Sequence, residues 1–476
     1  MKLKRIIAAA IAVAVVGISP AAPIAHVFMD RAITASAENG KVVASGSCGT
    51  VEHESEVTWK LTQNNADKSS PRYTLTVSGT GAMMDYSEGT QPWSEYTDKI
   101  SELSIGDNIT TIGDCAFRGF TVLSSVSIPG NVKTIGKEAF LGCEKLKKAY
   151  LSSGLTTIGS GAFAHCYYLE EISIPDGVTS IGQGAFQYDS KLTGITIPGS
   201  MTSIGGDAFL YCNGITEITI LNGVKVIDDK AFRHLPKLKK VSVPASVTSI
   251  GEFAFSDCKL LSGITIPYGV TSIGDEAFSH CTSLEHINIP RSVTYIGIGA
   301  FAYSGLTEVT LPESVKSMGL SAFLCCSKLT AVSVMASDFI FSKTDGQICN
   351  KADNMEEGDT VYIFNGTIRG YEGSTAQDYA KKYGYKFEAM KEPSKLGDID
   401  GNGIINAVDA SKILVKCAEL SAPDAEEVTA EVIAKYDINW DGLITAVDAS
   451  FVLAYCADLA DDPDLKIEDF IAERKK

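Results

Sequence analysis

A phenylalanine preceded by alanine returns at a fixed spacing through the middle of the chain. Nine of these phenylalanines follow one another in steps of 23 residues, and a tenth comes 22 residues after the ninth. Such a period indicates a solenoid, in which each copy packs on its neighbours and none has a core of its own. The phenylalanines are Phe117, Phe140, Phe163, Phe186, Phe209, Phe232, Phe255, Phe278, Phe301 and Phe323.

The copy that leads to Phe186 shows how one unit is expected to fold. Ile172 and Ile174 alternate with polar residues, which predicts a strand with one buried face. Pro175 lacks an amide hydrogen and ends that strand. Gly182 marks a turn that tolerates no Cβ, and the Ala-Phe pair returns to the interior on a short helical or irregular turn. The glycine recurs as Gly113, Gly136, Gly159, Gly205, Gly251, Gly274, Gly297 and Gly319.

The repeat pattern L-x-x-I-x-I-P-x-x-V-x-x-I-G-x-x-A-F-x-x-C resembles the BspA-like family of bacterial leucine-rich repeats. The resemblance implies a β-rich leucine-rich-repeat solenoid of about ten 23-residue repeats over residues 101–334. Both ends of a solenoid need a cap over the exposed apolar layer and strand edge. We expect an N-terminal cap over 38–100 and a C-terminal cap over 335–390. Segments that resemble the family's flanks are 48–50, 57–60, 75–81, 367–376 and 379–385.

Six of the twelve cysteines occupy one column, three residues after the repeat phenylalanine. An exported chain would normally use cysteines in disulfides. Stacked side chains lie about 5 Å apart, however, whereas a disulfide brings its Cβ atoms to about 3.8 Å. We therefore expect buried free thiols, and a structural role for the adjacent pair Cys325-Cys326. The column holds Cys143, Cys166, Cys212, Cys258, Cys281 and Cys326.

Histidine next to cysteine, at His165-Cys166 and His280-Cys281, could suggest a nucleophile with its base. These histidines and His234 all lie two residues after the repeat phenylalanine, so they form another column, and sequence neighbours usually point apart. The chain has no G-x-S-x-G, H-E-x-x-H, phosphate-binding glycine loop or paired Cys-x-x-Cys. A glycosidase with a pair of catalytic carboxylates is not excluded by the sequence, because the two residues need not be close along the chain. We predict a solenoid without catalytic residues.

The strand column expected to face solvent carries short, uncharged, polar side chains. Sugar-binding platforms present aromatic faces, and only Tyr150 offers one here. A protein or another cell-surface ligand is therefore the expected partner, although the column could also serve only to keep the sheet soluble. Its members are Ser127, Tyr150, Ser173, Thr196, Thr219, Ser242, Thr265, Asn288, Thr310 and Ser333.

The first residues have the pattern of an export signal. Lys2, Lys4 and Arg5 precede an apolar run over 6–18, and Ala35-Ser36-Ala37 fits a cleavage site, which predicts a signal peptide over 1–37. Cleavage after Ala25 and a retained membrane anchor are the alternatives, but the apolar run is short for a full span. We expect a secreted protein with no stable membrane span after cleavage. The net charge of −17 argues against nucleic acid as a partner.

Two twelve-residue segments near the C-terminus, 398–409 and 437–448, fit the rule of a calcium-binding loop. Oxygen-bearing residues take positions 1, 3, 5, 9 and 12, position 7 offers its backbone carbonyl, and glycine at position 6 allows the sharp turn. Two matches 39 residues apart predict two bound Ca²⁺ ions. The first set is Asp398, Asp400, Asn402, Ile404, Asn406 and Asp409, and the second is Asp437, Asn439, Asp441, Leu443, Thr445 and Asp448.

Each loop is expected to lead into an exit helix, over 409–417 and 448–456. Pro393 and Gly397, in a linker over 391–397, prevent a helix from entering the first loop. A duplicated loop and exit helix resembles a type I dockerin, here a small all-α domain over 398–460 followed by a tail over 461–476. The resemblance implies that this domain binds a cohesin on a cellulosome-type scaffold. Ala-Val at loop positions 10 and 11 would contact the cohesin or cover the domain's own core: Ala407, Val408, Ala446 and Val447.

These features together predict a secreted, non-catalytic binding or adhesion subunit. It would dock through a calcium-dependent dockerin–cohesin interaction to a cellulosome-type scaffold that degrades polysaccharide. One alternative is a free or surface-tethered adhesin that binds proteins of a host or a neighbouring cell. Another is an enzyme with an unrecognised site in the segments 38–100 or 335–390.

Overall fold

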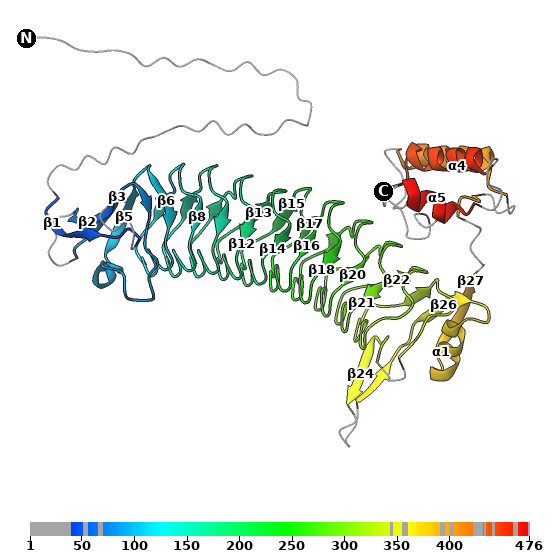
Figure 1. Ribbon diagram of the computed structural model, residues 1–476. Helices are drawn as coiled ribbons and strands as arrows, with labels where there is room; N and C mark the ends of the chain where they lie inside the picture. Colours follow the sequence, from blue (N-terminus) through cyan, green and yellow to red (C-terminus); the bar gives the residue numbers. More distant parts are fainter. Residues whose placement is uncertain are drawn as a thin grey trace, which may run out of the picture. The chain divides into compact units, whose positions relative to one another are not determined.

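The computed structural model describes most of the chain in three parts: an N-terminal cap with the solenoid, a C-terminal cap, and a C-terminal helical module (Figure 1). The predicted signal peptide lies outside the described residues. These residues are 40–50, 56–64, 70–342, 346–354, 360–390, 396–399, 404–421, 432, 435–439, 443–459 and 465–474.

The alternating strand predicted in the repeats pairs in parallel with its copy in the next turn, within three separate sheets along the solenoid. Ser125 lies opposite Lys148, and Glu217 lies opposite Lys240, so the register equals the repeat length. The inward side chains, such as Val126, are buried, while the flanking residues face solvent. These strands are β7 (Ser125–Ser127), β9 (Lys148–Tyr150), β11 (Glu171–Ile172), β13 (Gly194–Ile197), β15 (Glu217–Ile220), β17 (Lys240–Ser242), β19 (Gly263–Ile264), β22 (Glu308–Leu311) and β23 (Ala331–Val334).

A second ladder of parallel strands lies just before the recurring glycine. The sequence predicted only a turn at this place. Thr157 pairs with Thr134 on one side and with Ser180 on the other. The strands are β6 (Ile109–Ile112), β8 (Thr134–Ile135), β10 (Thr157–Ile158), β12 (Ser180–Ile181), β14 (Ser203–Ile204), β16 (Val226–Ile227), β18 (Ser249–Ile250), β20 (Ser272–Ile273) and β21 (Tyr295–Ile296).

The Ala-Phe segment forms an irregular turn that hydrogen-bonds to the next copy. The amide of Phe140 donates to the carbonyl of Ala162 at 2.7 Å, and the amide of Phe163 donates to that of Ala185 at 2.8 Å. His165, two residues after the phenylalanine, has a φ of 61°. Non-glycine residues rarely adopt this left-handed conformation, and here the same bend returns in successive turns. Where both ladders are continuous, a turn is thus joined to the next along three edges.

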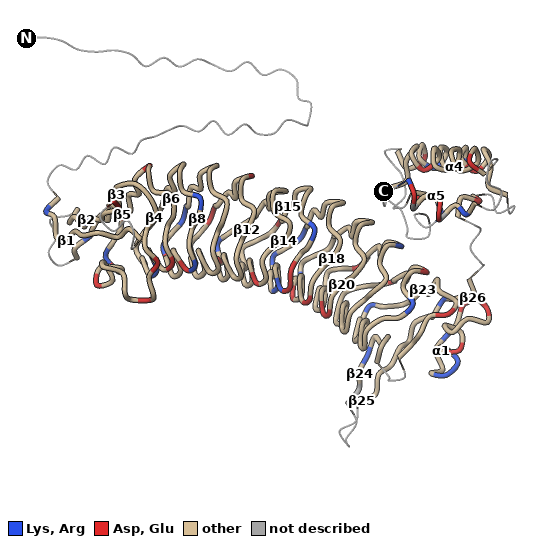
Figure 2. Tube along the Cα trace, viewed as in Figure 1, with Lys and Arg blue, Asp and Glu red and all other residues tan. Residues whose placement is uncertain are grey.

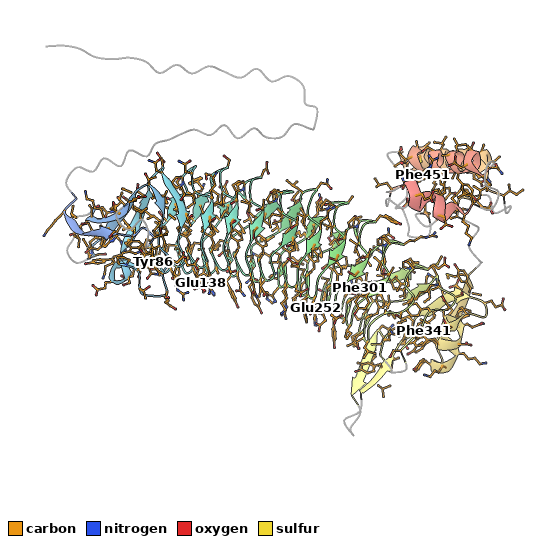
Figure 3. The ribbon with its side chains drawn as sticks, viewed as in Figure 1. Tyr86, Glu138, Glu252, Phe301, Phe341 and Phe451 are labelled. Atoms are coloured by element: carbon orange, nitrogen blue, oxygen red, sulfur yellow. The ribbon has the colours of Figure 1, made fainter. Side chains whose placement is uncertain are left out.

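The phenylalanine side chains fill the interior as one continuous stack. From Phe140 to Phe323, neighbouring ring centroids lie 5.1–5.7 Å apart and the rings are within 20° of parallel. All ten rings are fully buried, Phe301 among them (Figure 3). Glycine is required at Gly159, because a Cβ there would meet backbone atoms of Gly136 and Lys137 at 2.6 Å. The predicted solenoid is confirmed, and with its flanking segments it has about 13 turns.

The segment before the first repeat forms a small sheet that closes the N-terminal end of the stack. Its order is β1 (Val42–Ser47), β2 (Val57–Gln63), β3 (Tyr73–Gly79) and β5 (Ile100–Ile105), antiparallel except for the last pair. β4 (Gly81–Ala82) pairs with β6. Trp93, just before the 3-10 helix η1 (Ser94–Tyr96), is fully buried and stacks on Phe117 at 6.1 Å. The indole therefore covers the first phenylalanine ring.

The segment after the last repeat adds two strands and a helix to the stack. β26 (Thr367–Tyr371) pairs in parallel with β23, and β27 (Lys386–Met390) pairs with β26. The helix α1 (Thr375–Tyr383) ends at Gly384, which has a left-handed φ of 70°. β24 (Lys351–Asn354) and β25 (Thr360–Ile363) form an antiparallel pair. Tyr379 of α1 stacks on Phe341 at 4.0 Å, which packs the helix against the end of the core.

The C-terminal module has its own apolar core, which among its described residues is made by helices and the segments before them. The helices are α2 (Ala407–Leu420), α4 (Ala446–Asp458) and α5 (Ile467–Arg474). Ile413 of α2 and Val452 of α4 are fully buried between them. Phe470 of α5 is buried as well and contacts the ring of Tyr455 at 5.6 Å. The core thus includes a helix from the segment that the sequence analysis described as a tail.

Candidate metal centre and interaction surfaces

The first acidic loop ends in a capped helix. Asn406 is the N-cap of α2 and accepts a hydrogen bond from the amide of Val408 at 2.7 Å. Asp409 is fully buried, and its two oxygens accept from the amides of Ile399 and Asn406, each at 2.8 Å. The carboxylate at loop position 12 therefore ties the start of the loop to the start of the helix.

The second loop repeats this arrangement. Thr445 caps α4 and accepts from the amide of Val447 at 3.1 Å. Asp448 is fully buried and accepts from the amides of Asn439 at 3.0 Å and Thr445 at 2.7 Å. The described ends of the two loops are thus held in a similar way, although the early amide is at loop position 2 in the first and position 3 in the second.

The remaining predicted ligands divide between described and undescribed residues. Asp398, Asp437 and Asn439 are buried. Ile404 and Leu443, at loop position 7, expose their side chains, as residues that act through their carbonyls can. The others, Asp400, Asn402 and Asp441, lie outside the described residues. Within the part that is described, no three His, Cys, Asp or Glu side chains come together as a metal-binding group.

The donor atoms that are described suit a hard cation. They are carboxylate, amide, hydroxyl and carbonyl oxygens, with no sulfur or imidazole among the predicted ligands. Asp409 and Asp448 have no exposed surface, and burial of a carboxylate is costly unless hydrogen bonds and a cation compensate it. The loops therefore fit Ca²⁺ by their chemistry.

The two halves of the module make reciprocal contacts, as an approximate twofold between duplicated halves predicts. The thiol of Cys456, near the end of α4, donates to the carbonyl of Ile405 in the first loop at 3.5 Å. Burial, and then the charge of Asp448 in the second loop, raise the pKa of Cys417 near the end of α2. Burial, and then the charge of Asp409, raise the pKa of Cys456. Each helix therefore ends beside the loop of the other half.

Apolar side chains are exposed at equivalent positions of both halves. Ala407, Val408, Ala446 and Val447 all face solvent, so they are not part of the module's core. Val408 is 53% and Val447 49% exposed, and such matched exposure in a small module is typical of a contact surface. Further pairs with similar exposure are Ile404 with Leu443 and Leu414 with Leu453.

The solvent-facing strand column of the solenoid has the character that the sequence predicts. Its side chains are exposed or half-buried, and Tyr150 is 58% exposed. Two residues before this column, ion pairs join side chains of neighbouring turns. Lys148 pairs with Glu171 at 3.4 Å, and Lys240 pairs with Glu217 at 3.8 Å. Charges of both signs are interspersed along the solenoid (Figure 2). The sheet thus presents a mixed, mainly neutral surface.

The histidine and cysteine columns are structural. The thiol of Cys166 is fully buried and donates to the carbonyl of Phe140 at 3.4 Å, and burial raises its pKa well above the ordinary value. The ring of His165 instead stacks on Tyr188 at 4.6 Å. All twelve cysteines of the chain are free thiols in this structure.

Half-buried rings form a row along the solenoid at the positions two residues after the repeat phenylalanines. The sequence-based prediction included only the histidines of this row. Tyr188 also stacks on Tyr211 at 5.0 Å, and Tyr211 contacts His234 at 4.5 Å. The column two residues after each phenylalanine was the signal that could have revealed it. These contacts between neighbouring turns leave the rings half-buried.

Comparison with protein families identifies two segments of the chain. The model of the BspA type leucine rich repeat region (6 copies) matches residues 94–216 and 202–330. The model of the dockerin type I domain matches residues 396–456. No curated protein matches the chain.

Several solved structures are similar to the solenoid. A leucine-rich repeat protein from Bacteroides ovatus is 22% identical, with a TM-score of 0.40 over 70% of this chain and 98% of that one. A leucine rich cell surface protein from Faecalibacterium prausnitzii is 24% identical, with a TM-score of 0.35 over 63% and 90%. The pneumococcal vaccine antigen PcpA is 19% identical, with a TM-score of 0.38 over 74% and 99%.

Proposed function

Because this chain carries a leucine-rich repeat region of the BspA type and a type I dockerin domain, we propose that it is a secreted, non-catalytic binding subunit that docks onto a cohesin-bearing scaffold. Both matched modules are binding modules, and proteins that carry them are typically extracellular. No helix among the described residues is long and apolar enough to cross a membrane. The solenoid would present its exposed sheet to a protein or another cell-surface ligand. The scaffold would be of the cellulosome type, which places the protein beside polysaccharide degradation.

The observation that carries the docking proposal is the matched geometry of the two halves of the module. Asp409 and Asp448 each accept one hydrogen bond from the N-cap amide and one from an amide early in the loop, that of Ile399 at position 2 or of Asn439 at position 3. The Ala-Val pairs that follow are exposed in both halves. Type I dockerin domains bind calcium, and we infer two ions, one in each loop. When bound, the ions would neutralise the buried carboxylates and so favour the folded loops.

The first loop would hold its ion through Asp398, Asp400, Asn402, Ile404, Asn406 and Asp409. The second would use Asp437, Asn439, Asp441, Leu443, Thr445 and Asp448. This chain's own residues prepare both sites, because Asn406 and Thr445 start the helices and Asp409 and Asp448 close the loops. The exposed Ala-Val pairs then lie at the first turn of each helix, where a cohesin would contact them.

Because both halves carry the same exposed pair, the module could dock in two orientations related by its twofold. The test is cohesin binding by the full-length protein, measured by calorimetry with calcium and with EDTA. We expect binding only with calcium, near-normal affinity for Ala407→Arg and for Ala446→Arg, and none for the double variant. Glu473→Arg, on α5, is a control for an added positive charge.

Loss of binding in one single variant would mean a single orientation. No binding to any cohesin, with or without calcium, would contradict the docking proposal. It would favour an adhesin whose partner is bound by the solenoid alone. Hydrolysis of a glycan or peptide panel by the full-length protein would contradict the non-catalytic assignment.

A further inference from the structure

Two cysteines outside the buried column lie side by side where the solenoid meets its C-terminal cap. Cys325 follows Phe323 by two residues, at the position that carries Tyr303 in the preceding turn. Cys349 comes from the segment that precedes β24. Their sulfur atoms are 3.9 Å apart, and the amide of Cys325 donates to the sulfur of Cys349 at 3.0 Å.

Backbone hydrogen bonds on both sides of the pair fix this approach. Phe323 and Ile348 form a parallel bridge. The amide of Cys349 donates to the carbonyl of Phe323 at 3.2 Å, and the amide of Cys326 donates to the carbonyl of Cys349 at 3.1 Å. The two chain segments are therefore held in register, and the sulfur contact does not depend on one flexible side chain.

The column cysteines are arranged differently. Cys143 and Cys166 lie in neighbouring turns, yet each thiol donates to the carbonyl of a phenylalanine, at 3.3 and 3.4 Å. Cys281 is also fully buried and donates to a phenylalanine carbonyl at 3.2 Å. Cys325 instead is partly exposed to solvent. Cys325 and Cys349 thus combine a contact between their sulfur atoms with access from solvent.

We propose that Cys325 and Cys349 form a disulfide when the protein meets a disulfide oxidant, such as oxidised glutathione or a thiol–disulfide oxidoreductase. The thiolate of Cys325 attacks one sulfur of the oxidant, which releases one thiol and leaves a mixed disulfide on Cys325. Cys349 then loses its proton and attacks the sulfur of Cys325, which releases the second thiol. Two cysteine thiols are oxidised and one oxidant disulfide is reduced to two thiols.

The order of these steps follows from the surroundings of the two thiols. Cys325 can be reached from solvent, whereas Cys349 is buried. Burial raises the pKa of Cys349 to about 12, so its thiol stays protonated and is a poor first nucleophile. Once Cys325 carries the mixed disulfide, Cys349 is already in contact with the sulfur that it must attack.

The cross-link would fasten the C-terminal cap to the last turn of the stack. The last phenylalanine ring is fully buried, and the bridge at Ile348 covers the open edge of its turn. Opening of this edge would expose unpaired backbone and an apolar layer. A disulfide across it restricts such opening, because the two segments can no longer separate.

The test uses the full-length protein, incubated with oxidised and reduced glutathione, alkylated under denaturing conditions and digested with trypsin. We expect a disulfide-linked pair of peptides, residues 317–328 and 344–351. Cys326 lies in the first peptide, so Cys326→Ser is the matched control. Ser304 holds the equivalent place one turn earlier. The linked pair should persist in Cys326→Ser and vanish in Cys325→Ser and in Cys349→Ser.

Oxidation should also slow cleavage of the cap by thermolysin by at least about tenfold, since closing a loop of this size limits local opening. Cys325→Ser and Cys349→Ser should lose this protection and Cys326→Ser should keep it, while the reduced forms of all three fold as the wild type does. Complete alkylation of Cys325 and Cys349 after incubation in the oxidised buffer would overturn the proposal. A linkage through Cys326 would overturn it as well.

Discussion

The solenoid and the C-terminal module are both built by repetition, but they gain their stability in different ways. The solenoid repeats an apolar layer, in which each phenylalanine ring lies 5.1–5.7 Å from the next. The module repeats only twice, around a small core that includes Ile413 and Val452, and its repeated element is an acidic loop. Repetition of an apolar interface adds stability with every copy, whereas repetition of acidic residues adds repulsion, which the proposed cations would offset.

Removal of calcium should separate the two regions most strongly. Chelation should unfold the module while leaving the solenoid folded, because the ions bind only the folded loops. Each ion contributes about 4 kcal/mol when its concentration exceeds its dissociation constant a thousandfold. Hydrogen exchange of the full-length protein with and without EDTA would show which amides lose protection. One melting transition that does not change with calcium would contradict this difference.

Truncation of one ring should reveal the dependence of the solenoid on its stack. Phe209→Ala should lower the free energy of unfolding by about 3–5 kcal/mol, because it removes a fully buried ring between two others. Thr196→Ala, on the exposed strand column, is the control and should change it little. The measurement is urea unfolding of the full-length protein with calcium present. A loss below about 1 kcal/mol would show that neighbouring turns can close the gap.

A matched pair of glycine substitutions should show how closely the turns approach. Gly159→Ala should lower the free energy of unfolding by about 2 kcal/mol or more, because the added Cβ would meet backbone atoms of the preceding turn at 2.6 Å. Gly263→Ala should change the free energy of unfolding by less than about 0.5 kcal/mol, since no atom lies within 4 Å of its Cβ. Thermal unfolding compares them directly. Equal effects would mean that the close approach at Gly159 is not a constraint.

The smallest effect should come from a carboxyl group in the cysteine column. Asp189 is fully buried, and one of its oxygens has no hydrogen-bond partner among the described residues. Burial raises its pKa well above the usual 3.8, so the folded state binds its proton more tightly than the unfolded state does. Its contribution is therefore favourable below about pH 4 and is lost as the pH rises.

Asp189→Cys places the column's common residue at this position and should stabilise the solenoid by about 1–2 kcal/mol at neutral pH. The variant removes the carboxylate oxygen that accepts from the amide of Cys166 at 2.9 Å, but this amide keeps its hydrogen bond to the carbonyl of Phe163 at 3.3 Å. Unfolding measured from pH 4 to pH 8 should show the gain growing with pH. A gain that is constant or shrinks as pH rises would contradict a buried, protonated carboxyl.

Much of the solenoid could be predicted because its determinants are periodic. The spacing of Phe163 and Phe186 and the alternation around Ile172 specify the stack and the first sheet. The second ladder escaped prediction, because Thr157 and Ile158 form a strand of two residues, too short to show alternation. The left-handed bend at His165 was missed for another reason. It is imposed by hydrogen bonds to the next turn, which no single copy reveals.

The helix after each acidic loop was likewise predictable from the spacing, although both helices begin two residues before the predicted start, at Ala407 and Ala446. The participation of α5 in the core of the module could not be predicted in this way. Its sequence follows an acidic stretch, and the burial of Phe470 depends on its contact with Tyr455, which is distant along the chain. The pairing of Cys325 with Cys349 depends in the same way on the path of the cap. Local patterns predict elements, while contacts between elements require the fold.

The 23-residue register that most turns share has a consequence for how such a chain can change its length. Because Ser125 meets Lys148 and Glu217 meets Lys240 with the same offset, gain or loss of one whole copy leaves all remaining contacts as they were. The two caps would meet the same layer as before. A duplication of 23 codons would then lengthen the exposed sheet by one ring spacing, so the reach of the protein can vary among relatives in uniform steps.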